Sequence, residues 1–131
     1  MMFIDPALDL TDHAAVAWYY NILLGIANYP ADTKTAVTYG HSIEWGKPEE
    51  EDCDMEGAFL EMPCAIQNTE ILRCKLGLFK TAICLQVITL TREEINKLLE
   101  VGPQRYSYLL YPDSEDAKAH FLCEKKRTEK F

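Results

Sequence analysis

The chain has 131 residues, of which 48% are hydrophobic and 26% are charged, and its formal net charge at pH 7 is −8. These values are typical of a globular chain with a hydrophobic core and exclude a wholly disordered one. The net negative charge argues against direct binding of nucleic acid and against attraction to an anionic membrane.

The first expected helix begins after Thr11 or Asp12, either of which can cap it, and runs to about Tyr29, where Pro30 ends it. Over residues 14–27 the only strongly polar side chain is that of Asn21. This apolar stretch is too short for the ~20 residues that span a bilayer. Because a helix that is apolar on nearly every side is buried or docked, we expect either a core helix or a homodimer interface.

Strand-like composition recurs along the rest of the chain, in segments rich in β-branched, aromatic and other apolar residues. The expected strands cover residues 34–39, 57–62, 70–77, 82–90 and 105–111.

The strongest local signal is a strand followed by a capped helix, in residues 81–100. Thr91 and Glu94 form a capping box, in which each side chain binds the other residue's backbone N–H. The apolar stripe of this helix is formed by Ile95, Leu98 and Leu99. Gly102 and Pro103 then end the helix.

The last segment, residues 114–125, fits two structures. It forms either a helix through Cys123 or a strand that pairs back on residues 105–111. Taken together, the elements predict a single α+β domain over residues 1–131. An antiparallel or mixed sheet of about five strands packs against the apolar N-terminal helix and the capped helix near 92–100.

Nearly all of the net charge lies in one segment, residues 44–61, which we call the acidic segment. It holds eight acids and one base, a net charge of −7, whereas the remaining residues hold thirteen acids and twelve bases. A solvated loop is the simplest explanation of such a run. The functional explanation is that the segment docks on a basic partner protein.

The docking hypothesis names the acids of the segment, with Trp45 as an apolar anchor. Its residues are Glu44, Trp45, Glu49, Glu50, Glu51, Asp52, Asp54 and Glu56. Because strongly basic protein surfaces are mostly those that bind nucleic acids, a sharper hypothesis is an inhibitor of a nucleic-acid-handling protein, of the kind that mobile elements encode. We expect such a protein to act in the cytoplasm.

The alternative is a small hydrolase or nuclease-like enzyme, or a ligand-binding domain, that uses His41 with nearby carboxylates such as Glu44, since histidine titrates near neutrality. No nucleophile elbow or phosphate-binding loop accompanies His41, so the sequence favours a protein that is not an enzyme. The five cysteines show no close metal-binding pair, and we expect reduced thiols, no metal and no cofactor.

Overall fold

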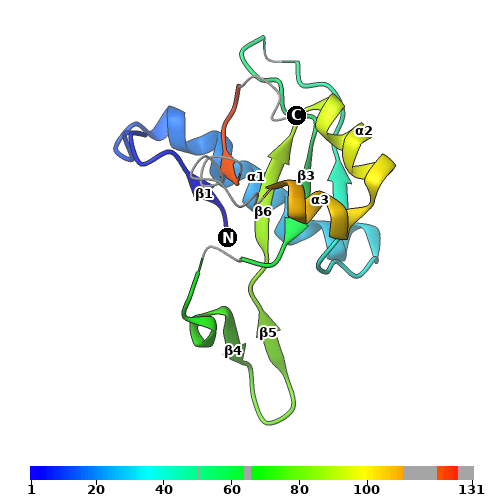
Figure 1. Ribbon diagram of the computed structural model, residues 1–131. Coiled ribbons are helices and arrows are strands. Elements are labelled where there is room, and N and C mark those ends of the chain that lie inside the picture. Colours follow the sequence, from blue (N-terminus) through cyan, green and yellow to red (C-terminus); the bar gives the residue numbers. More distant parts are fainter. Residues whose placement is uncertain (50, 64–65, 111–120, 127–131) are drawn as a thin grey trace.

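A computed structural model describes residues 1–49, 51–63, 66–110 and 121–126 (Figure 1). The fold is α+β, as the sequence predicts. Its elements in chain order are β1 (Phe3–Ile4), α1 (His13–Thr33), β2 (Ser42–Glu44), β3 (Gly57–Glu61), η1 (Thr69–Leu72), β4 (Arg73–Lys75), β5 (Thr81–Ile83), β6 (Gln86–Leu90), α2 (Arg92–Val101), α3 (Pro103–Leu110) and β7 (Leu122–Cys123).

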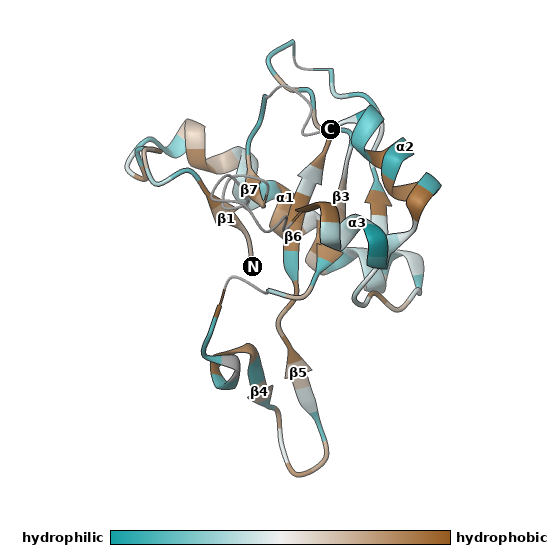
Figure 2. Ribbon diagram, viewed as in Figure 1, coloured by the Kyte–Doolittle hydropathy of each residue, from teal (hydrophilic) through white to brown (hydrophobic). Residues whose placement is uncertain are grey.

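The core is built on an antiparallel three-stranded sheet in the order β2-β3-β6. Every residue of β3 and β6 is buried, because the sheet has a helical layer on each face. Side chains alternate between the two faces with a period of two. Phe59 and Ile88 face α2 and α3, whereas Ala58 and Val87 face the side of α1. In Figure 2 the hydrophobic colouring accordingly gathers on these central strands.

The capping box of α2 is confirmed. The Glu94 N–H donates to Thr91 Oγ1 at 3.3 Å, and the Thr91 N–H donates to Glu94 Oε2 at 2.9 Å. The helix ends at Val101, and Gly102 follows with φ of 82°, in the region that favours glycine. Ile95 is buried against the sheet, but Leu99, expected in the same stripe, is 65% exposed.

The N-terminal helix α1 is capped by Asp12, whose carboxylate accepts the N–H of Ala14 at 3.0 Å. The expected end at Pro30 is wrong, because α1 continues to Thr33. The Pro30 carbonyl still accepts an N–H from Lys34, so the proline removes a donor without ending the helix. No residue of α1 is fully buried; its Ile22 and Ile26 pack on the sheet, whereas other apolar residues stay in solvent.

The prediction of one sheet of about five strands is wrong, because the described residues form one three-stranded and two two-stranded sheets. Residues 34–39 form no strand. The 82–90 segment is divided between β5 and β6. Residues 105–110 belong to α3, because Tyr106 and Leu110 are buried one helical turn apart against the core.

Two small strand pairs complete the fold. Of the expected strand at 70–77, residues 73–75 form β4, which makes an antiparallel hairpin with β5, and η1 precedes it. Strand β7 pairs in parallel with β1, so Leu122 and Cys123 belong neither to a helix nor to a hairpin with residues 105–111. The rest of the ambiguous segment, up to residue 120, lies outside the described residues.

Candidate functional site

Most acids of the acidic segment lie in the connection from β2 to β3, residues 45–56, which we call the acidic loop. Backbone hydrogen bonds close its base. The N–H groups of Trp45 and Gly46 both donate to the carbonyl of Glu56, at 3.0 and 3.2 Å. These bonds continue the β2–β3 ladder beyond the last paired residues, Glu44 and Gly57. The loop that carries the acids therefore begins and ends on two strands of the central sheet.

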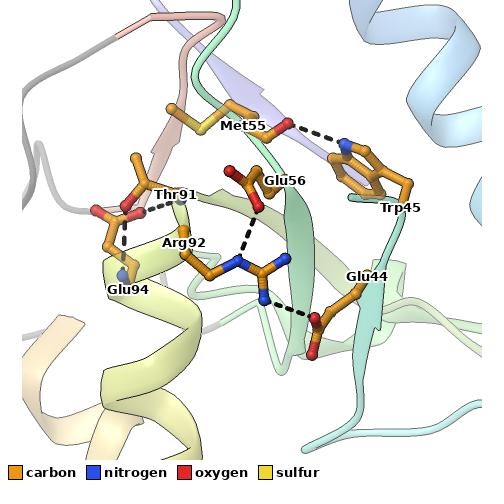
Figure 3. A network of polar contacts seen from close by, with 7 residues as sticks. All are labelled: Glu44, Trp45, Met55, Glu56, Thr91, Arg92 and Glu94. Atoms are coloured by element: carbon orange, nitrogen blue, oxygen red, sulfur yellow. Dashed lines mark hydrogen bonds and ion pairs between the residues drawn. The ribbon is translucent and has the colours of Figure 1, made fainter. Parts of the chain in front are cut away.

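A single base, Arg92, holds both ends of this loop (Figure 3). Its Nη1 lies 2.8 Å from Glu44 Oε2, and its Nε lies 2.8 Å from Glu56 Oε2. The hydrogen bonds that Arg92 donates to the carboxylates of Glu44 and, to a lesser extent, Glu56 raise the pKa of Arg92. Arg92 is the first residue of α2, directly after the capping residue Thr91, so the cap also fixes the backbone from which the guanidinium reaches the loop.

A second base, Lys125, holds the middle of the loop from the other end of the chain. Its Nζ lies 3.0 Å from Asp52 Oδ2, and its carbonyl accepts the N–H of Asp54 at 3.1 Å. The hydrogen bond from Lys125 lowers the pKa of Asp52. Sequence reasoning missed both bases, because neither lies near the acids in the chain.

The remaining acids divide into a solvated group and a buried residue. Glu49, Glu51 and Asp54 are exposed, and the described residues give them no ion pair. Glu50 lies outside the described residues. Glu61, counted in the acidic segment, is only 2% exposed and adds nothing to the surface charge.

An apolar cleft of about 770 Å³ runs beside the acidic segment, between it and α1. Trp18, Ile22 and Ile26 line it from the helix, whereas Trp45 and Glu49 line it from the loop. Trp45 is 41% exposed, and its indole Nε1 donates to the Met55 carbonyl at 2.9 Å (Figure 3). The anchor expected from the sequence is thus held in one orientation with part of its ring in solvent.

The alternative pair of His41 and Glu44 is not brought together. His41 is exposed, and its Nδ1 accepts the N–H of Thr38 at 3.4 Å, whereas the Glu44 carboxylate binds Arg92. No contact joins His41 to a carboxylate in the described part of the chain. Within the same residues, no group of three histidine, cysteine or acidic side chains converges as a metal site would require.

Glu61 forms a separate buried polar contact that the sequence did not reveal. Its Oε1 accepts the Met62 N–H at 2.8 Å, and its Oε2 accepts the hydroxyl of Ser107 from α3. Burial raises the pKa of Glu61, although both hydrogen bonds act in the opposite direction. This contact joins the end of β3 to α3 and has no connection with the acidic loop.

In the described residues no helix is both long enough and apolar enough to cross a membrane. Comparisons with known proteins identify relatives. The family model described as Suppressor of fused protein (SUFU) matches residues 1–112. No curated protein matches the chain.

Solved structures share the fold, among them the following two. One is described as the Sufu-Fu complex, and the other as Drosophila Suppressor of Fused. Each is 14% identical to this chain with a TM-score of 0.65, and each alignment covers 86% of this chain. The alignments cover 44% and 24% of those two proteins, so the chain spans less than half of either.

Proposed function

The chain belongs to the Suppressor of fused family, and from that premise we propose that it is a protein-binding regulator that docks its acidic segment on a basic surface of a partner. A related structure is described as a complex of Sufu with Fu, which supports a protein partner for this chain as well. The partner itself is identified here only by its chemistry, as a surface rich in lysine and arginine.

The observation that carries the proposal is the contrast between anchored and solvated acids in one loop. Arg92 and Lys125 bind Glu44, Glu56 and Asp52 and thereby fix the loop. The exposed carboxylates of Glu49, Glu51 and Asp54 are then presented without a described counter-ion. A preorganised charged surface loses little conformational entropy on binding, and opposite charge speeds encounter with the correct partner.

Trp45 supplies the apolar part of this surface. Interfaces gain most of their affinity from a few aromatic or arginine residues that become fully desolvated. Trp45 is half-exposed beside the solvated acids, and the cleft along α1 continues the apolar surface. The exposed side of α1 within residues 14–27, with Tyr20 and Leu24, would extend it or hold a second copy of the chain.

A finer form of the proposal is that the partner handles nucleic acid and that the acidic segment occupies its nucleic-acid groove, as an inhibitor encoded by a mobile element would. The support is electrostatic, since a groove that binds phosphates also attracts clustered carboxylates. Such an inhibitor would act in the cytoplasm, where its thiols stay reduced; Cys53, Cys74 and Cys84 form no disulfide.

The test compares three versions of the chain as bait in a host lysate. The first is wild type, and the second carries Glu49→Gln, Glu51→Gln and Asp54→Asn. The matched control carries Asp32→Asn, Glu70→Gln and Glu93→Gln, which remove the same charge from exposed positions elsewhere. We expect wild type and control to capture the same basic protein and the loop variant to lose it. Equal capture by all three would overturn the proposal.

A further inference from the structure

The hairpin of β4 and β5 projects from the body of the protein as an arm (Figure 1). Five of the six residues in its two strands are exposed, and the sixth, Ala82, is half-buried. A lone two-stranded hairpin is marginally stable in water. An arm of this kind is therefore expected to gain order from a surface that covers it.

The tip of the arm is apolar and its flanks are basic. Leu78 is 94% exposed and Phe79 is 98% exposed, the largest values among the exposed hydrophobic residues. Gly77, with φ of 130°, allows the turn, and the Leu76 N–H closes it on the Lys80 carbonyl at 2.8 Å. Between Arg73 and Ile83 the sequence holds three bases and no acid.

The cleft beside the acidic segment has the complementary properties. Its walls are apolar, with Trp18 and Ile26 from α1. Its rim carries two acids: Glu44, which is bound to Arg92, and Glu49, which has no ion pair among the described residues. Its volume of about 770 Å³ is ample for the Leu78 and Phe79 side chains. One base, Lys125, also lines the cleft, but its ammonium group is bound to Asp52. An apolar tip with basic flanks matches an apolar cleft with an acidic rim.

The two surfaces cannot meet within one copy, because the arm and the acidic loop lie at opposite ends of the molecule (Figure 1). Two copies placed antiparallel would bring each arm beside the cleft of the other. A two-fold axis then repeats the contact and closes the assembly. We propose that two copies of this chain associate reciprocally, the β4–β5 arm of each entering the cleft between α1 and the acidic segment of the other.

This association would cover part of the surface proposed above for the basic partner, so dimer and partner compete for the cleft. It differs from a dimer made through α1 alone, because it depends on residues of the arm. The proposed dimer forms without the basic partner protein, so experiments on the purified chain alone test it. Loss of the dimer with intact partner capture would refute only this inference. A wild-type dimer together with no capture even by the monomeric Phe79→Ser variant, whose cleft is free, would refute only the proposed function.

The experiment is sedimentation equilibrium of the purified chain over a concentration series. Reductant is kept present because Cys74 is exposed on the arm. Wild type is compared with Phe79→Ser, and with Tyr108→Ser as the control for losing an exposed aromatic residue, since Tyr108 is 80% exposed and lies on α3. Circular dichroism checks that each variant is folded.

We expect wild type and Tyr108→Ser to form dimers. Phe79→Ser should weaken the dimer at least about 100-fold, because each dimer buries two copies of Phe79. A monomeric wild type, or equal dimerisation of all three versions, would overturn the inference.

A mixing experiment tests the reciprocal geometry. Ala17→Arg places a positive charge on an exposed residue that lines the cleft, so this variant keeps its arm and loses its cleft. Phe79→Ser keeps its cleft and loses its arm. Each variant alone should be monomeric, and their equimolar mixture should form a one-to-one complex through the one intact contact. A mixture that stays monomeric would contradict the arm-in-cleft contact.

Discussion

The packing of β2 on β3, which positions both ends of the acidic loop, can be tested by the substitution Gly57→Ala. Gly57 pairs with Glu44 in β2 and with Leu90 in β6. A Cβ atom there would lie 2.7 Å from the carbonyl oxygen of Ile43 and 2.9 Å from Cδ1 of Ile95. The first of these neighbours is backbone, so β2 must move away from β3, and Glu44 moves with it.

The effect of Gly57→Ala on the free energy of unfolding is estimated by comparison with the same substitution at a second glycine. Overpacking of a close-packed site costs about 1–3 kcal/mol, and about 0.4–1 kcal/mol is regained because alanine restricts the unfolded chain. Gly25 in α1 has no atom within 4 Å of its added Cβ. Gly25→Ala should therefore stabilise the protein by about 0.5–1 kcal/mol, the usual gain of alanine over glycine in a helix.

The assay is urea unfolding followed by far-ultraviolet circular dichroism and tryptophan fluorescence. Gly57→Ala should lower the midpoint and Gly25→Ala should raise it, with unchanged denaturant dependence in both. The unfolded-state effect of the two substitutions is the same, so the difference reports the folded structure. A Gly57→Ala variant as stable as Gly25→Ala would refute the close contact of β2 with β3.

Two further predictions concern β3 residues on the same face of the sheet, towards α2 and α3. Phe59 is fully buried, with its ring centroid 5.6 Å from that of Tyr106, so Phe59→Ala should cost about 3–5 kcal/mol in urea unfolding; a loss below about 1 kcal/mol would contradict this packing. Burial raises the pKa of Glu61 above its ordinary 4.5, so stability falls as pH rises through the folded pKa. Glu61→Gln should therefore stabilise the protein at pH 7 and lose that advantage below about pH 4; an advantage independent of pH would contradict the assignment.

The parts of the fold that the sequence predicted are those fixed by neighbouring residues. The capping box of Thr91 and Glu94 needs only groups three residues apart, and the end of α2 needs only Gly102. The start of α1 is set in the same way by Asp12. Such hydrogen bonds form within one turn, so the chain carries the whole signal locally.

The parts that were mispredicted depend on distant contacts. Residues 105–110 have β-prone tyrosines, but burial of Tyr106 against Phe59 makes the helix the better structure there. Pro103 at the first position of α3, directly after Gly102, was the overlooked signal. The pairing of β1 with β7 joins the two ends of the described chain, and no local pattern indicates it.

For the candidate site, the sequence located the acidic residues but not the basic residues that bind them. The run of acids and the neighbouring Trp45 were visible in the chain. The ion pairs from Arg92 and Lys125 were not, because the side chains meet only through the fold. For the same reason Glu61 was counted with the surface acids, although the end of β3 is buried beneath α3.

The most direct test of the proposed function is the affinity of the chain for the basic protein that wild type captures, titrated at low and at physiological salt. The account predicts that neutralising Glu49, Glu51 and Asp54 weakens binding by orders of magnitude at low salt and removes most of its salt dependence. The control with Asp32, Glu70 and Glu93 neutralised should bind like wild type. Equal affinities and equal salt dependence for all three versions would contradict the claim that the acidic segment makes the contact.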